Sequence, residues 1–148
     1  MLYRLASQGW WCASANYRRG RGRRWPDQLI DAQRAIAWAL AAATGHGEAA
    51  PAVFVAGSSA GAHLAAMAAL TSPAGAGQPD TPLAGAICLY GFYDTPTWID
   101  REPSAPSAPI DLIGASAVPF FIAHGALDSY VPVVGPRRFA TANEQIGG

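Results

Sequence analysis

Short apolar runs alternate along the chain with longer segments in which apolar residues recur at helical spacing. The uninterrupted runs at 52–56, 83–90 and 118–123 are typical of strands that are buried on both faces. Segment 9–15 is also short and apolar, and it follows a few residues that resemble the end of a helix. The pattern therefore predicts four buried strands.

Helices are predicted between these runs. Pro26 and Asp27 suit a first helical turn, because proline has no N–H to satisfy there and the carboxylate faces the positive end of the helix dipole. Helical spacing extends this helix over 26–43, and further helices are predicted at 62–70 and 132–146. Strands that alternate with helices indicate an α/β fold, a mostly parallel sheet with helices on both faces.

The composition indicates one soluble globular domain. Of the 148 residues, 51% are hydrophobic and 14% are charged. No stretch reaches the roughly 18 apolar residues of a membrane span, and Arg4 with Gln8 interrupts any secretory leader. We therefore expect a cytoplasmic protein. The proline-rich segment 103–109 is expected to be a loop.

Charge gives no indication of a nucleic-acid partner. Ten cations balance ten anions, so nothing attracts the chain generally to phosphates. Five of the cations cluster, at Arg18, Arg19, Arg21, Arg23 and Arg24. Such a cluster can bind phosphate or RNA, but no aromatic platform accompanies it, so we favour a solvated loop interrupted by glycine.

The two cysteines, Cys12 and Cys88, both lie in apolar runs. Free cysteine behaves as a small hydrophobic residue in such places. We expect two buried thiols rather than a disulfide or a reactive site.

A candidate nucleophile lies in the segment Gly57-Ser58-Ser59-Ala60-Gly61, between a predicted strand and a predicted helix. In this pattern the central serine occupies a sharp turn, and its hydroxyl projects beyond the end of the sheet. Ser59 is then the candidate nucleophile, and the backbone amide of Ala60 is a candidate oxyanion donor. We expect that a side chain at Gly57 or Gly61 would collide with the neighbouring strand or helix. The alternative, an accidental turn, is disfavoured by the strand and helix on either side.

A candidate acid, Asp128, lies in the loop that follows the predicted strand 118–123. Serine hydrolases of the α/β type place serine, acid and histidine in this order along the chain. Asp128 would then orient a histidine and stabilise its charged form. The alternatives are a loop aspartate that binds local backbone amides and, as a less favoured acid, Asp94 after the preceding strand.

These motifs together resemble the α/β-hydrolase esterases related to hormone-sensitive lipase and bacterial carboxylesterases. Four blocks carry the resemblance over nearly the whole chain: 14–18 (Ser-Ala-Asn-Tyr-Arg), 25–38 with its Trp-Pro-Asp start, 57–64, and 124–132 with its His-Gly, Asp and Val-Pro. The resemblance implies hydrolysis of small-molecule carboxylic esters through an acyl-enzyme, without a metal or an organic cofactor. It also implies packing roles for His63 and His124.

The resemblance further implies that residues 1–148 form a partial α/β-hydrolase domain. The family's His-Gly-Gly oxyanion loop precedes the block at 14–18, and its catalytic histidine follows the final helix. A family strand would also lie between segments 9–15 and 52–56. We therefore expect the isolated chain to be nearly inactive, because loss of a triad histidine lowers turnover by about 10⁶.

Three hypotheses follow for function. The chain is a piece of an esterase, a non-catalytic binding or scaffold module of the same fold, or one half of a split enzyme that a second chain completes. We favour the first, because an intact Ser59, Ala60 and Asp128 would be unusual in a long-decayed scaffold. The pattern carries no signal for an oligomeric state.

Overall fold

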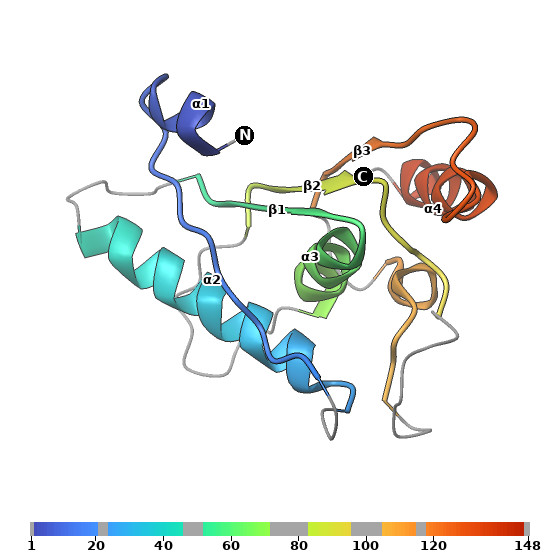
Figure 1. The fold of residues 1–148 in the computed structure, drawn as a ribbon, viewed down its shortest axis with the longest axis horizontal. Coiled ribbons are helices and arrows are strands. Elements are labelled where there is room, and N and C mark those ends of the chain that lie inside the picture. The colour runs from blue at the N-terminus through green and yellow to red at the C-terminus, as the bar shows by residue number, and fades with distance from the viewer. Residues whose placement is uncertain are drawn as a thin grey trace.

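The computed structural model describes residues 2–20, 24–45, 52–71, 83–95, 105–114 and 118–146. Within them, a sheet of three parallel strands has the order β1-β2-β3 (Figure 1). The strands are β1 (Phe54–Ser58), β2 (Gly85–Leu89) and β3 (Phe120–Ala123). Each strand begins two residues after the start of its predicted apolar run, and the parallel direction confirms the predicted sheet type.

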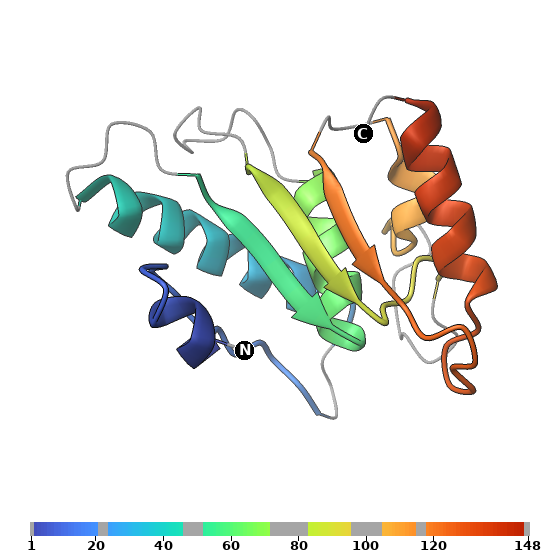
Figure 2. The same ribbon diagram turned by 90° about the horizontal axis from the view of Figure 1, so that it is seen from above.

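The helices agree with the predicted segments. They are α1 (Leu2–Ala6), α2 (Asp27–Gly45), α3 (Ala60–Thr71) and α4 (Val134–Gln145), with a short 3₁₀ helix η1 (Pro109–Leu112). The 3₁₀ helix begins at the last proline of the predicted loop 103–109. Figures 1 and 2 show α2 and α3 on one side of the sheet, α4 beside β3, and α1 on the opposite side near β1.

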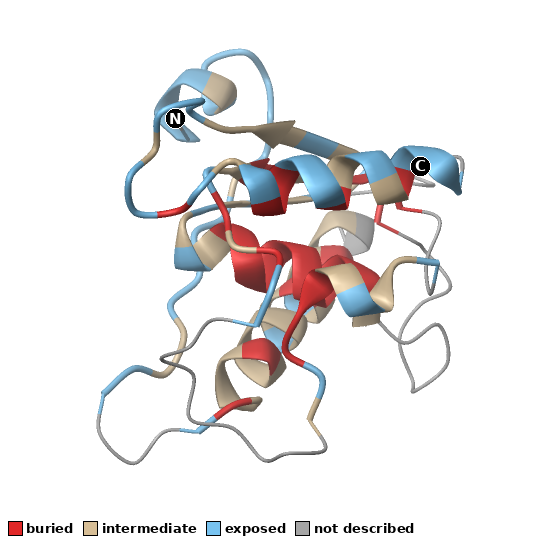
Figure 3. Ribbon diagram, turned by 90° about the vertical axis from the view of Figure 1, so that its right-hand side faces the viewer, coloured by how far each residue is buried: buried red, intermediate tan, exposed pale blue. Residues whose placement is uncertain are grey.

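The core lies between the sheet and α3. All nine residues from Ala62 to Leu70 are buried, and Figure 3 shows this helix at the centre of the buried region. The opposite face of the sheet is open by comparison, since Phe54 is 42% exposed and Phe121 is 62% exposed. The expectation of buried strands is therefore wrong for β1 and β3, neither of which contains a buried residue, and correct for the central strand β2.

The predicted strand at 9–15 is wrong. Residues 10–19 carry no strand assignment. The Trp10 ring instead packs edge-to-face on Phe54 with ring centroids 5.7 Å apart, and Trp11 packs on Trp38 at the same distance. The segment thus contacts its neighbours through aromatic side chains, and the sheet's strand pairings do not include it.

Arg18 anchors this segment to α2. Its guanidinium and backbone N–H donate to both carboxylate oxygens of Asp31 over 2.8–2.9 Å, and it lies 3.2 Å from Asp27. These hydrogen bonds lower the pKa of Asp31 to about 2. The expectation of a solvated arginine loop is thus wrong for Arg18, while Arg19 and Arg24 are exposed. Arg21 and Arg23 lie outside the described residues.

Both cysteines are free, as expected, but only Cys88 is buried. Burial raises the pKa of its thiol to about 12, which makes it unreactive. Cys12 is half-buried, because its segment does not join the sheet. Across the part of the chain that the structure describes, no helix is long and apolar enough to cross a bilayer.

Candidate active site

Ser59 lies in the turn between β1 and α3. Its backbone is left-handed, with φ of 52°, a conformation that is uncommon for any residue other than glycine. The Ser59 N–H donates to the Leu89 carbonyl over 3.0 Å. Its own carbonyl accepts from the amides of Ala62 and His63 at 3.0 and 3.2 Å. The serine is therefore fixed by backbone hydrogen bonds on both sides of the turn.

Only one of the two elbow glycines meets the steric expectation. A Cβ at Gly57 would overlap the Gly61 carbonyl and lie 2.7 Å from the Ala62 nitrogen. A Cβ at Gly61 would meet nothing within 4 Å, leaving aside the helix's own backbone nearby. The predicted collision at Gly61 is thus wrong, because its Cβ position points away from strand and helix neighbours. The close approach falls on Gly57 alone.

Ala60 is the first residue of α3 and is exposed. The first N–H groups of a helix have no partner within the helix, and they lie at the positive end of its dipole. An oxygen that gains negative charge beside Ser59 can accept a hydrogen bond from such a group. The role of the Ala60 amide as oxyanion donor stays a prediction.

A second left-handed residue, Tyr90, lies at the end of β2 with φ of 42°. Its N–H donates to the Ala123 carbonyl over 2.8 Å, as the Ser59 N–H does to Leu89. These two bonds join the carboxyl ends of the three strands. Ser59 and the loop after β3 therefore belong to the same edge of the sheet. Sequence reasoning did not identify Tyr90, because nothing in the residue type indicates a left-handed backbone.

Asp128 is held by its own loop. One carboxylate oxygen, Oδ1, accepts from the amides of Tyr130 and Val131, both over 2.9 Å. These two hydrogen bonds lower the pKa of Asp128, so the group is a carboxylate at neutral pH. The local backbone bonds of the alternative hypothesis are therefore present, and they occupy only Oδ1. Among the described residues, Oδ2 accepts no hydrogen bond, and this oxygen can receive an N–H from a histidine.

His124 supports the same loop. Its Nε2 lies 2.8 Å from the Val131 carbonyl and 3.6 Å from Asp128 Oδ2. Since Nε2 carries one proton, the shorter contact is the hydrogen bond and the imidazole donates to the carbonyl. This contact agrees with a packing role, as the resemblance implies.

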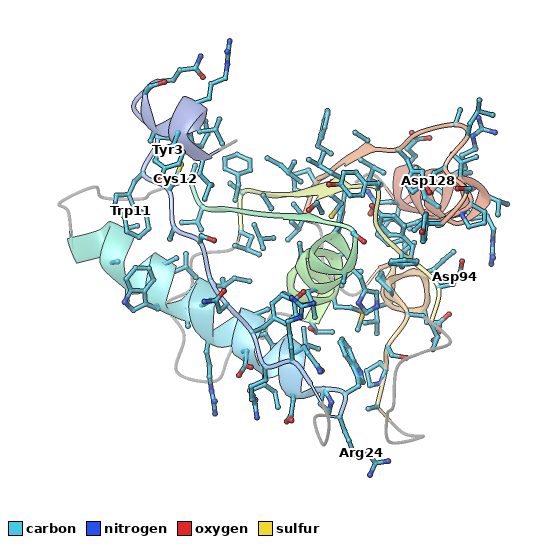
Figure 4. The ribbon with its side chains drawn as sticks, in the orientation of Figure 1. Tyr3, Trp11, Cys12, Arg24, Asp94 and Asp128 are labelled. Carbon is cyan, nitrogen blue, oxygen red and sulfur yellow. The ribbon has the colours of Figure 1, made fainter. Side chains whose placement is uncertain are left out.

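Asp94 differs from Asp128 in both exposure and partner. Its side chain is 54% exposed and lies 3.4 Å from Arg138 of α4. Both aspartates lie on the α4 side of the molecule (Figure 4). An exposed pair of this kind contributes little and holds no fixed direction toward Ser59.

His63 lies one turn after Ser59 and is buried. Its Nε2 donates to the Ser107 carbonyl over 2.8 Å, and its ring packs on Trp25 with centroids 5.4 Å apart. Burial lowers the pKa of His63, so the ring is neutral at pH 7. Among the described residues its ring makes no hydrogen bond to Ser59, so the geometry gives this histidine no role as a base for the nucleophile.

The described residues contain no cluster of three or more histidine, cysteine or acidic side chains that could hold a metal ion. An apolar depression of about 190 Å³ lies at the opposite end of the sheet, near the start of the strands. Its lining includes Phe54, Ala86, Pro119 and Phe121. The depression is therefore separate from the edge that carries Ser59.

Comparison with known proteins identifies the family. The BD-FAE family model matches residues 1–81. The esterase LipC of Mycobacterium tuberculosis is 34% identical, and the probable carboxylic ester hydrolase LipM of that organism is 32% identical, both over 99% of this chain. The chain spans 45% of LipC and 40% of LipM, which is less than half of each relative.

A solved structure agrees with this result. Esterase 2 of Thermogutta terrifontis, phosphonylated by cyclosarin, matches with a TM-score of 0.72 and 28% identity. The match covers 90% of this chain and 54% of that one. The resemblance inferred from the four sequence blocks is confirmed. The chain belongs to the BD-FAE family, within the α/β-hydrolase esterases.

Proposed function

We propose that the protein carrying this chain hydrolyses small-molecule carboxylic esters, with Ser59 as nucleophile, Ala60 as oxyanion donor and Asp128 as acid. One observation carries the proposal. Ser59 is held in a left-handed turn at the start of α3, on the sheet edge from which the Asp128 loop also emerges. The esterase names of the relatives support it. Because those relatives are more than twice as long, the activity of the whole protein is part of the proposal.

The chemistry follows from these groups. Ser59 Oγ attacks the ester carbonyl carbon as its proton passes to a base, and the carbonyl oxygen becomes an oxyanion that accepts the Ala60 N–H. The C–O bond to the alcohol then breaks, and the base returns the proton to the leaving alkoxide. Water, deprotonated by the same base, then attacks the acyl carbon. The bond to Ser59 Oγ breaks, the base returns the proton to the serine, and the carboxylic acid product leaves. No metal or organic cofactor enters these steps.

The base in this proposal is a histidine carried by polypeptide other than residues 1–148. Among the described residues, His63 and His124 hydrogen-bond backbone carbonyls and neither hydrogen-bonds Ser59, while His46 lies outside those residues. The family order, in which the histidine follows the acid, supports this assignment. Asp128 Oδ2 would accept the Nδ1–H of that histidine and stabilise its charged form. The proposal therefore treats residues 1–148 as a partial α/β-hydrolase domain.

The cytoplasmic location stays a prediction, which cell fractionation tests.

The test compares the chain as given with the chain extended by its flanking coding sequence. We expect the extended form to hydrolyse p-nitrophenyl butyrate and to react with a fluorophosphonate probe, and the short form to do neither. In the extended form, Ser59→Ala should lower turnover by about 10⁶ and abolish labelling. Ser58→Ala, the neighbouring serine, is the matched control and should leave both unchanged.

Two outcomes would contradict the proposal. Full turnover by the short form would mean that a histidine within these residues is the base. Stable folding of both forms without turnover or labelling would favour the non-catalytic module.

A further inference from the structure

A buried pair of side chains, Trp25 and His63, binds two consecutive carbonyls from far away in the sequence. Trp25 Nε1 donates to Pro106 over 2.7 Å, and His63 Nε2 donates to Ser107 over 2.8 Å. The two rings also pack on each other. Trp25, His63 and Ser107 are each only 3% exposed. We call these two donors the Trp25/His63 clamp.

Segment 105–109, which contains the two bound carbonyls, depends on hydrogen-bond donors from other parts of the chain. Pro106 and Pro109 have no backbone N–H, so the segment 105–109 cannot pair as an ordinary strand. Ser107 is buried, so its carbonyl needs a hydrogen-bond partner, whereas Pro106 is exposed. An imidazole meets this need at Ser107, and an indole binds the adjacent carbonyl of Pro106.

The same segment is tied to the chain that leaves β2. The hydroxyls of Ser107 and Thr95 lie 3.2 Å apart, and the Ile110 N–H donates to Tyr93 over 3.0 Å. The clamp therefore grips a part of the structure that is itself fixed to the end of the central strand. Segment 105–109 is thus held in place by other contacts, and His63 can be anchored against it.

His63 belongs to the first turn of α3, and its backbone N–H donates to the Ser59 carbonyl. The buried part of α3 is rich in alanine, with Leu64, Met67 and Leu70 as its large apolar side chains. Alanine offers little shape to interlock, so polar contacts at the two ends contribute strongly to fixing the helix about its axis. At the far end, Gln33 Nε2 donates to the Thr71 hydroxyl over 3.2 Å.

We propose that Trp25 and His63 are positioning residues for the nucleophile, which lock the first turn of α3 and thereby fix the direction of Ser59 and the Ala60 amide. This inference rests on the proposed function. Displacement of a reacting group by about 1 Å can lower rates by about 10²-fold, so a small rotation of α3 is enough to impair acylation. Neither side chain touches the reacting atoms.

The experiment uses the extended form that hydrolyses p-nitrophenyl butyrate. His63→Leu and Trp25→Phe each remove one donor, and Trp25→Phe keeps an aromatic ring. We expect each to lower kcat, and the rate of Ser59 phosphorylation by paraoxon, by about tenfold to a hundredfold, with KM nearly unchanged. His63→Gln retains a side-chain N–H donor and should restore most of the loss.

Gln33→Leu is the matched control, because it removes a hydrogen bond from the opposite end of the same helix. It should lower the melting temperature about as much as His63→Leu does, and leave kcat near the wild-type value. If His63→Leu does not fold, the milder Trp25→Phe variant decides. An equal fall in kcat for Gln33→Leu, or unchanged kcat in both clamp variants, would overturn the inference while the proposed function stands. An extended wild-type form without any turnover would overturn the proposed function, and this inference with it.

Discussion

The nucleophile elbow is held mainly by backbone packing and backbone hydrogen bonds, whereas the acid loop is held by a side chain. At the elbow, Gly57 touches the backbone of Gly61, Ser59 is left-handed, and the following helix is buried along nearly its whole length. At the loop, Asp128 organises the turn through its own carboxylate, near the surface. The elbow therefore depends on close backbone packing together with backbone hydrogen bonds, and the acid loop on hydrogen bonds to a charged side chain, so each should fail under a different perturbation.

After removal of the nucleophile itself, removal of the acid's charge should have the largest effect on turnover. In the extended form, Asp128→Asn keeps an oxygen for the Tyr130 and Val131 amides, so the loop should persist. Loss of the negative charge should nevertheless lower kcat for p-nitrophenyl butyrate by about 10⁴. Asp94→Asn is the control, and its exposed pair with Arg138 predicts little change. A larger loss from the Asp94 variant would transfer the acid role to that residue.

At the elbow, the space available for a Cβ should determine how much each glycine substitution destabilises the fold. Gly57→Ala forces a Cβ into the backbone of α3 and should destabilise the fold by about 3 kcal/mol. Gly61→Ala meets open space and replaces a helical glycine, so it should change stability by less than about 1 kcal/mol in either direction. Denaturant titration of both variants measures this difference. Equal losses would mean that the two glycines share the steric demand after all.

Lowering the pH should destabilise the two regions at different pH values, with smaller effects than the substitutions above. The pKa of His63 is lowered from its ordinary 6.5 by burial, so the unfolded chain binds more protons and stability falls as pH drops below about 6.5. The pKa of Asp128 is lowered from 3.8, so its contribution is present above 3.8 and is lost only below that pH. Melting temperatures measured from pH 8 to pH 3 test this order. His63→Gln should remove the step at higher pH, and a step that persists in this variant would exclude His63 as its source.

Local pattern predicted the elements well because their causes are local. Apolar runs gave the three strands, and helical spacing with Pro26 and Asp27 gave α2. The glycine-serine pattern located the elbow because strand and helix flank it directly. Asp128 was likewise found from its place after a strand, although its catalytic role stays a prediction.

The errors arose where the decisive contact is distant or depends on a backbone angle. Segment 9–15 has the composition of a strand, yet it contacts Phe54 through the Trp10 ring and does not join the sheet, and composition alone does not specify a pairing partner. The pairing of Trp25 with Pro106 spans 81 positions, and no periodicity indicates it. The open space at Gly61 depends on the direction of one Cα–Cβ bond, which the motif does not specify.

The two left-handed residues also shape the electrostatic potential at the edge of the sheet. Strand ends commonly present carbonyl oxygens, whose partial negative charge would repel an anion. Here the N–H groups of Ser59 and Tyr90 bind the carbonyls of Leu89 and Ala123 and offset that charge. The amides at the start of α3 follow the nucleophile directly and lie at the positive end of the helix dipole. Because these dipoles are fixed before substrate arrives, an ester carbonyl would meet a polarity that already favours its anionic form.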